Sequence, residues 1–382
     1  MAKYEEKDNV LLRVAKYLIP WEGDKPGEKV RKLIFLAAAV VLIVTVSILV
    51  VNGITQAQDN RRNSEIQDIY HNGSSSKPLS NSEDSSGNSG NVSGDTSVII
   101  GSNGESSSSS STSQPTEIIP SLKDIYELNH DTIGWITIAD DSRTVVDLPV
   151  LQSEDNEYYL THDFDGNPSR AGALYADYHA PVTATERPAN IVIYGHNMGS
   201  GEYFGQLFDY CNYSESNGDP TNISMYKRFP TITFNTLYKE STYKIFGGML
   251  VNVEEEYGEV FPYHMIRDFE TKSDFDNFCA EVLDRSTFIN PDVDLKYGDN
   301  LITLSTCSWG YGTPNIGNGD AQLRWVIVAR EVRDGEDPSV DVEKAYYNPS
   351  PKFCEAYYRN YIGYGEWEGR GWKEDIIYGY NG

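Results

Sequence analysis

The pattern of apolar and polar residues divides the chain into three parts. Residues 33–51 form an uncharged apolar run in which Thr45 and Ser47 are the polar interruptions. A long Ser-, Asn- and Gly-rich stretch follows, and short β-type runs then continue from about Ile118. The apolar run reaches roughly 28 Å as a helix at ~1.5 Å per residue, close to the ~30 Å of a bilayer core. It therefore predicts one transmembrane helix over 33–51.

Positive charges predict the orientation of this helix. The amino side carries Lys25, Lys29, Arg31 and Lys32, whereas Arg61 and Arg62 lie well beyond the other end. The positive-inside rule then gives a cytoplasmic segment over 1–32, with everything after the helix outside the cell membrane. A cleaved signal peptide is the alternative, but residues 1–32 are long for its charged region and no clear A-x-A site follows. We expect a retained single-pass anchor.

Residues 52–117 are predicted to be a disordered extracellular tether. From about Ala57 to Thr116 the composition is dominated by Ser, Asn and Gly, with a Ser run over 106–111. Such a segment cannot bury enough apolar area to offset the entropy lost on ordering. A coil of ~60 residues has an end-to-end distance of roughly 40 Å. The tether would hold the folded part away from the membrane.

The globular domain is predicted over 118–333, with a helix at 119–129 followed by β-rich runs. The expected strands are 134–138, 144–150, 189–194, 231–235, 242–251, 300–306 and 323–328, most of them separated by turn residues. Many short strands with scattered helices indicate a mostly β fold, a barrel or a sandwich. A second helix is expected over 273–285, with Ser273 as N-cap and Cys279 packed in the core.

Composition narrows the class of function. The net charge of −26 excludes a nucleic-acid partner, because phosphate contacts require clustered Lys and Arg. The scattered His and Asp residues do not group at metal-ligand spacing, so we expect no metal and no cofactor. The apolar fraction of 39% suffices for a proper core.

The sequence TLSTC, residues 303–307, places Cys307 where a strand opens into a Gly-rich loop. This position suits a reactive thiol more than a structural one. Strand alternation puts Ile302, Leu304 and Thr306 on a core face, and Leu301, Thr303, Ser305 and Cys307 on a face that we expect to line a groove.

A thiol nucleophile needs a base and a group that stabilises the oxyanion. His196 follows the apolar strand at 189–194 and the strand breaker Gly195, so it can act as the base. Arg324 opens an otherwise apolar strand one loop after Cys307, where a guanidinium could stabilise an oxyanion. Taken singly, a hydrogen-bonded surface histidine and an edge-strand arginine facing water are the alternative interpretations.

With these residues in view, the chain resembles the sortase family of Gram-positive bacteria, and most closely its class B branch. The motifs occur in order over about 118–330: LN at 128–129, GWI at 134–136, LPVLQ at 148–152, DNEYYL at 155–160, YGHNM at 194–198, TLSTC at 303–307, and the strand at 324–330. The helix at 273–285 is similar to the extra helix of class B. The resemblance implies an eight-stranded β-barrel with N-terminal helices and an extra helix before the TLSTC strand.

The resemblance also implies the reaction. Cys307, His196 and Arg324 would be the catalytic residues of a cysteine transpeptidase that cleaves an LPXTG-like sorting signal of secreted proteins through a thioacyl-enzyme. The acceptor would be an amino group of the peptidoglycan precursor lipid II, which anchors the protein to the wall, or a pilin lysine, which builds a pilus. The groove residues implied are Ser305, Tyr194, Asn156, Leu160 and Ser308.

Two other classes of function stay open at this point. A cysteine hydrolase would use the same Cys and His but more often an Asn, Asp or His as the third residue. A membrane-tethered adhesin would need no reactive thiol. The extension at 334–382 continues past the expected last strand, is rich in Tyr and Trp, and either packs on the barrel or binds a partner. Cys211 and Cys354 are expected to be thiols, with a disulfide between them left open.

Overall fold

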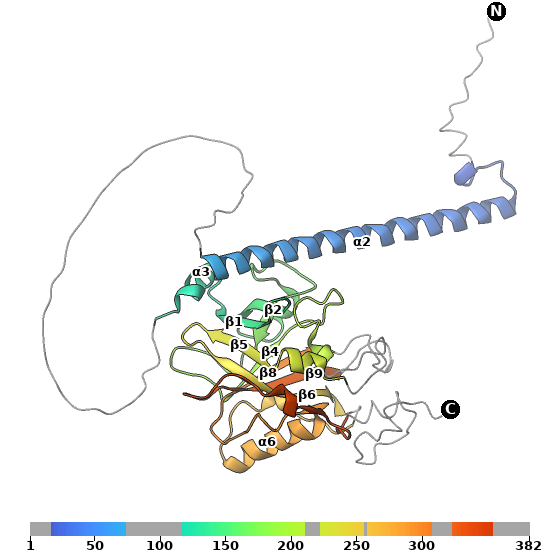
Figure 1. The fold of residues 1–382 in the computed structure, drawn as a ribbon. Helices are drawn as coiled ribbons and strands as arrows, with labels where there is room; N and C mark the ends of the chain where they lie inside the picture. The colour runs from blue at the N-terminus through green and yellow to red at the C-terminus, as the bar shows by residue number, and fades with distance from the viewer. Residues whose placement is uncertain (1–16, 74–116, 211–221, 256–257, 308–322, 354–382) are drawn as a thin grey trace, which may run out of the picture. The chain divides into compact units, whose positions relative to one another are not determined.

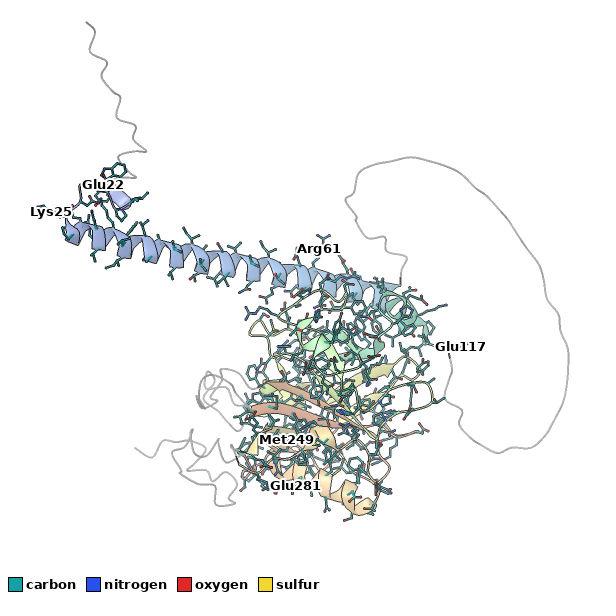
Figure 2. All side chains as sticks on the ribbon, turned by 180° about the vertical axis from the view of Figure 1, so that it is seen from behind. Glu22, Lys25, Arg61, Glu117, Met249 and Glu281 are labelled. Atoms are coloured by element: carbon teal, nitrogen blue, oxygen red, sulfur yellow. The ribbon has the colours of Figure 1, made fainter. Side chains whose placement is uncertain are left out.

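The computed structural model describes residues 17–73, 117–210, 222–255, 258–307 and 323–353. Its first long element is the helix α2, Pro26–Asn72. The helix includes an apolar window of mean hydropathy 3.2, long and apolar enough to cross a membrane. Figure 2 shows side chains projecting on all sides of α2 between Lys25 and Arg61. The expected helix at 33–51 is therefore the middle of a longer one.

The predicted tether is wrong over residues 52–72, which are helical. From Asn63 onward α2 belongs to the same compact unit as the barrel. Ile66 is fully buried there, and Ile69 and Tyr70 pack into the same cluster. Tyr70 stacks on Trp135 with ring centroids 4.0 Å apart, and Asn235 donates a 3.0 Å hydrogen bond to its hydroxyl. Residues 66, 69 and 70 have helical spacing, a signal masked by the polar composition around them. Residues 74–116 lie outside the described ranges.

Eight strands close into a barrel in the order β1-β2-β3-β4-β8-β9-β6-β5 (Figure 1). These strands are β1 Thr132–Ala139, β2 Thr144–Leu151, β3 Leu174–Ala176, β4 Asn190–Tyr194, β5 Thr231–Thr236, β6 Thr242–Asn252, β8 Leu301–Cys307 and β9 Leu323–Glu331. The β2–β3 and β4–β8 pairs are parallel and the other pairs are antiparallel. The remaining elements are α3 Pro120–Leu128, α4 Tyr158–Thr161, η1 Leu207–Tyr210, α5 Ser224–Arg228, η3 Tyr263–Met265, α6 Lys272–Arg285, β7 Phe288–Ile289, η4 Val342–Lys344 and β10 Tyr346–Tyr347.

All seven strands expected from the sequence are present, and so are the two expected helices. The eighth barrel strand, β3, was missed because its residues Leu174–Ala176 are too few to show a period. The helix α6 begins one residue early, and its N-cap is Thr271 instead of Ser273. Thr271 and Asp274 form a reciprocal capping box, which satisfies two backbone N–H groups.

Strand alternation sorts side chains between the barrel interior and its outer face. On β9, Leu323, Trp325, Ile327 and Ala329 pack inside the barrel, whereas Val326 and Val328 pack outside. The outer cluster lies under α6, where it meets Phe278, Cys279 and Val282. Figure 2 marks this layer by Met249 on β6 and Glu281 on α6. Burial raises the pKa of the Cys279 thiol to about 12, as fits the predicted core residue.

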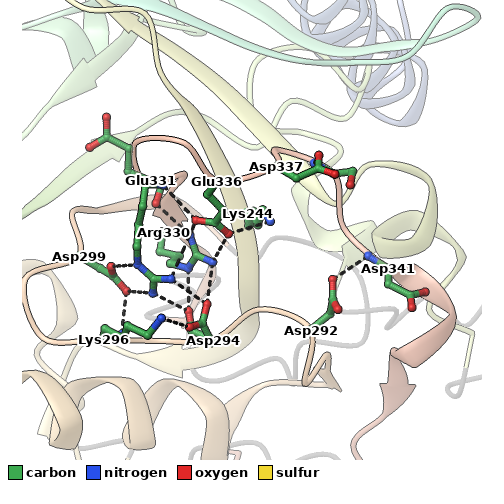
Figure 3. A network of polar contacts seen from close by, with 12 residues as sticks. Lys244, Asp292, Asp294, Lys296, Asp299, Arg330, Glu331, Glu336, Asp337 and Asp341 are labelled. Carbon is green, nitrogen blue, oxygen red and sulfur yellow. Dashed lines mark hydrogen bonds and ion pairs between the residues drawn. The ribbon is translucent and has the colours of Figure 1, made fainter.

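The chain continues past the predicted domain end at residue 333, and residues 334–353 pack on the barrel. β10 pairs with β7, and Phe353 is buried in the same cluster as the barrel interior. Glu336 forms ion pairs with Arg330 at the end of β9 and with Lys244 on β6 (Figure 3). The packed segment thus extends to Phe353, and residues 354–382 lie outside the described ranges.

Candidate active site

Three adjoining strands bring the predicted catalytic positions to one end of the barrel. β4 runs parallel to β8 with Tyr194 opposite Ser305, and the ladder continues as Gly195 N–H donates to the Ser305 carbonyl over 3.2 Å. β8 runs antiparallel to β9 with Cys307 opposite Arg324. His196 follows the end of β4, as Cys307 ends β8. The topology thus gathers three residues that lie up to 128 positions apart in the numbering, His196 to Arg324.

His196 follows a closely packed glycine after the end of β4. A Cβ at Gly195 would lie 2.4 Å from Cδ2 of Leu174 and 2.7 Å from Cδ2 of Phe204, so this position requires glycine. The His196 carbonyl accepts a hydrogen bond from Phe204 N–H over 3.1 Å. Burial lowers the pKa of the imidazole from its usual 6.5. Within the described part of the chain, its buried Nδ1 has no hydrogen-bond partner.

Arg324 lies near the start of β9, partly exposed, and its Nη1 donates to the Leu323 carbonyl over 2.9 Å. The positive charge of Arg324 also affects the pKa of His264 in η3. Burial lowers the pKa of His264, Asp177 opposes this shift, and the positive charges of Arg267 and Arg324 add to it. No sequence signal singled out His264, because its polar, loop-like context says nothing of where η3 packs.

The outer face of β8 is closed at two positions where the sequence predicted a groove. Thr303 is fully buried and donates to Oδ1 of Asn190 over 2.8 Å. Ser305 is 2% exposed, and its Oγ lies 2.7 Å from the hydroxyl of Tyr263. The segment between β6 and α6 covers this face, so the prediction of an open surface at both residues is wrong. No sequence signal linked Tyr263 to Ser305.

A buried carboxylate, which the sequence did not reveal, connects two predicted groove residues. Asp177 accepts hydrogen bonds from the Tyr194 hydroxyl (3.0 Å) and from Nδ2 of Asn156 (3.1 Å). Burial by itself would raise the pKa of Asp177, but these bonds and those from His179 hold it below its usual value. Burial and the charge of Asp177 in turn raise the pKa of Tyr194. Tyr194 is thus kept protonated as a hydrogen-bond donor.

The other predicted site residues are placed as follows. Leu160 lies on α4 with 41% of its side chain exposed. Ser308, Cys211 and Cys354 lie outside the described residues, and of Cys307 the backbone position in β8 is described. Over the described ranges, no three His, Cys, Asp or Glu side chains come together as a metal-binding group would require.

Comparisons with known proteins decide the family. No family model matches the chain. Sortase B of Listeria monocytogenes is 32% identical over 196 residues, which cover 50% of this chain and 68% of that protein. The chain belongs to the sortase B family. Sortase B of Staphylococcus aureus is 27% identical over 214 residues, covering 56% of this chain and 75% of that protein.

A solved structure agrees with the fold. The crystal structure of sortase B from B. anthracis in complex with AAEK1 matches with a TM-score of 0.50 and 20% identity, over 73% of this chain and 99% of that one. The predicted class B barrel, with its helix before the TLSTC strand, is therefore confirmed. As a sortase, this protein is a cysteine transpeptidase.

Proposed function

We propose that this sortase is anchored in the cell membrane and attaches secreted proteins to the cell wall. It would cleave an LPXTG-like sorting signal and transfer the protein to an amino group of lipid II. The observation that carries the proposal is the pairing of Cys307 with Arg324 across β8 and β9, with β8 next to β4, whose end His196 follows. A thiol, a base and a fixed cation are the groups that acyl transfer through a thioester requires.

The first half of the reaction makes the thioacyl-enzyme. The Cys307 thiolate attacks the threonine carbonyl of the signal, and the oxyanion is stabilised by Arg324 together with the Ser308 backbone N–H. Protonated His196 gives its proton to the leaving amine as the peptide bond breaks. Burial favours the neutral imidazole, so the imidazolium form of His196 would depend on the negative charge of the Cys307 thiolate beside it.

The second half uses His196 as a base. An amine attacks the thioester carbonyl, a C–N bond forms, and the bond to sulfur breaks. The proton lost by the amine passes to His196, which restores the thiolate and imidazolium pair. Asp177, through Tyr194 and Asn156, would keep the polar wall of the groove rigid.

Membrane topology follows from the anchor. The apolar window of α2 would span the bilayer with residues 1–32 in the cytoplasm, because the basic residues precede it. The catalytic barrel would then lie outside the cell, where sorting signals and lipid II meet. Pilin polymerisation, with a pilin lysine as the acceptor, is the second candidate function.

The decisive experiment follows both products of one peptide. Full-length enzyme in detergent is given a fluorescent LPXTG-like peptide, with and without triglycine, and products are separated by mass. Transfer to triglycine supports the proposal; acid release alone, unaffected by the amine, would show a hydrolase. Cys307→Ala should abolish both products without changing the thermal unfolding midpoint. Retention of activity in Cys307→Ala would contradict the proposed nucleophile.

A further inference from the structure

We propose that the loop after His196 forms the subsite for the acceptor amine, an inference that rests on the proposed transfer reaction. The loop lines a pocket of about 290 Å³ that is open to solvent. Its lining residues are Asn197, Met198, Gly199, Ser200, Gly201, Gly205, Gln206, Phe208 and Asp209. This volume is near the lower end of the range for small-molecule sites, ~300 to 1,000 Å³, and so suits an amino-terminated side chain or a short peptide end.

The pocket and the catalytic base share one piece of backbone. Asn197, which lines the pocket, is the residue after His196, and it bridges antiparallel to Tyr203. The next residue, Phe204, donates its N–H to the His196 carbonyl. The pocket lining thus begins one residue after His196, and the proposal places the bound amine within reach of that residue.

Local hydrogen bonds give the pocket a fixed shape. Gly201 N–H donates to the Met198 carbonyl over 2.8 Å, and Nε2 of Gln206 donates to the Gly201 carbonyl over 2.9 Å. A Cβ at Gly205 would lie 2.2 Å from the Met198 carbonyl oxygen, so the loop closes on itself only with glycine there. A preformed pocket binds without the entropy cost of ordering a loop.

The lining combines apolar and anionic groups. Met198 and Phe208 pack on the barrel core and offer apolar surface to methylene groups. Asp209 supplies a carboxylate whose side chain is 34% exposed, and Nη2 of Arg143 lies 3.7 Å from it. Glu202, on the same loop, accepts from the Ser200 hydroxyl and adds a second negative charge. One arginine against two carboxylates leaves the pocket net negative, as a primary ammonium group on an aliphatic stem requires.

The pocket therefore recognises a primary amine in its cationic form and passes it to the site as a nucleophile. The ammonium gives up one proton to solvent on leaving Asp209, and the neutral amine attacks the thioester. A C–N bond forms as the C–S bond breaks, and the second proton goes to His196. A peptide amino terminus and a lysine side chain share this chemistry.

The test measures the partition of the thioacyl-enzyme between amine and water. Full-length enzyme in detergent is given the sorting peptide with triglycine in one arm and Nα-acetyl-lysine amide in the other. In Asp209→Asn the apparent KM for the amine should rise by about 5- to 10-fold, because a charged hydrogen bond is lost. The arm with the larger loss identifies the source of the amine. Glu127→Gln, which removes an exposed charge on α3 and lies outside the pocket lining, is the control and should change the KM by less than about 2-fold.

A second variant keeps the test valid if Asp209→Asn fails to fold. Among the described residues, no atom lies within 4 Å of the place that a Cβ on Gly199 would take, so Gly199→Lys adds a competing ammonium at the pocket without a clash there. It should also raise the amine KM. Donor cleavage and product transfer by wild-type enzyme are measured alongside: absence of any transfer product would sink the proposed transfer reaction. An unchanged partition in both variants, with hydrolysis intact, would overturn the acceptor subsite alone.

Discussion

Two arginines on strand β9 show how differently one strand can use the same side chain. Arg324 pairs with Cys307 across the sheet, and Arg330 pairs with Leu301 at the other end. Arg330 is fully buried, and Glu336 accepts two hydrogen bonds from it, at 2.6 and 2.7 Å, while Asp294 accepts a third at 3.0 Å (Figure 3). Arg324 is partly exposed and donates to a main-chain carbonyl.

The surroundings of Arg330 and of Arg324 give the two guanidinium charges different roles. The carboxylates around Arg330 are stabilised in their charged form. Hydrogen bonds from Arg330, Lys244 and the Arg333 backbone keep the pKa of Glu336 well below its usual range. Hydrogen bonds from Lys296 and Arg333, against the effect of burial, lower the pKa of Asp294 to about 2. A paired arginine of this kind holds the 334–353 segment on the barrel. Arg324 lies opposite Cys307, where the proposed reaction would bring the substrate carbonyl.

Arg324→Lys tests the catalytic side of the comparison and has the largest expected effect. We expect turnover of the sorting peptide to fall by about 10²- to 10³-fold, because an ammonium cannot reproduce the planar fork that faces a developing oxyanion. Steady-state kinetics measure the loss, and the thermal unfolding midpoint should stay the same. Near-normal turnover would make Arg324 a surface charge.

Arg330→Met tests the structural side. Removing the buried guanidinium breaks its charged hydrogen bonds to Glu336 and Asp294, which costs about 1.5 to 3 kcal/mol of unfolding free energy, because both carboxylates are partly exposed and keep other partners. Urea unfolding of the full chain in detergent measures this loss, with Arg324→Met as the matched control on the same strand. Equal stability of the two variants would remove the distinction between the two arginines.

Low pH should reduce the unfolding free energy through two buried histidines, His196 and His264. Burial lowers the pKa of both His196 and His264 below the value of 6.5 expected in the unfolded chain. Between the folded and unfolded values the unfolded chain binds more protons, so stability falls as the pH falls through and below about 6.5. Unfolding free energies measured from pH 7.5 to 5 should show this slope. His264→Gln should flatten it, and an unchanged slope would mean that His264 titrates normally.

Lys344→Ala should have the smallest effect. Its ammonium lies 2.5 Å from Asp292, but 53% of the lysine side chain is exposed, so solvent and salt screen the pair. We expect no measurable shift of the thermal unfolding midpoint at physiological salt. A clear loss of stability would place the η4 segment in the same cooperative network as Arg330.

Much of the barrel could be read from the chain because its strands are long and alternate. On β9, apolar residues alternate inward and outward from Trp325 to Ala329, so its period is plain, whereas on β6 the alternation changes phase at the irregularity after Ile245. The packing of the end of α2 on the barrel could not be predicted from the sequence in this way. Ile66, Ile69 and Tyr70 are few and separated by polar residues, and their partner Trp135 is remote in sequence. Burial by a distant element is not a local property.

The sequence by itself determined the apolar N-terminal segment, the class of fold, and the choice of Cys307, His196 and Arg324 as candidate catalytic residues. These follow from side-chain period, charge and motif order, which are local properties of the sequence. Only the tertiary structure decided which polar side chains meet. Ser305 is closed off by Tyr263, Asp177 joins Tyr194 to Asn156, and Arg330 is enclosed by Glu336 and Asp294. These contacts join distant segments whose separation is fixed by strand register and loop packing, and no local pattern encodes either.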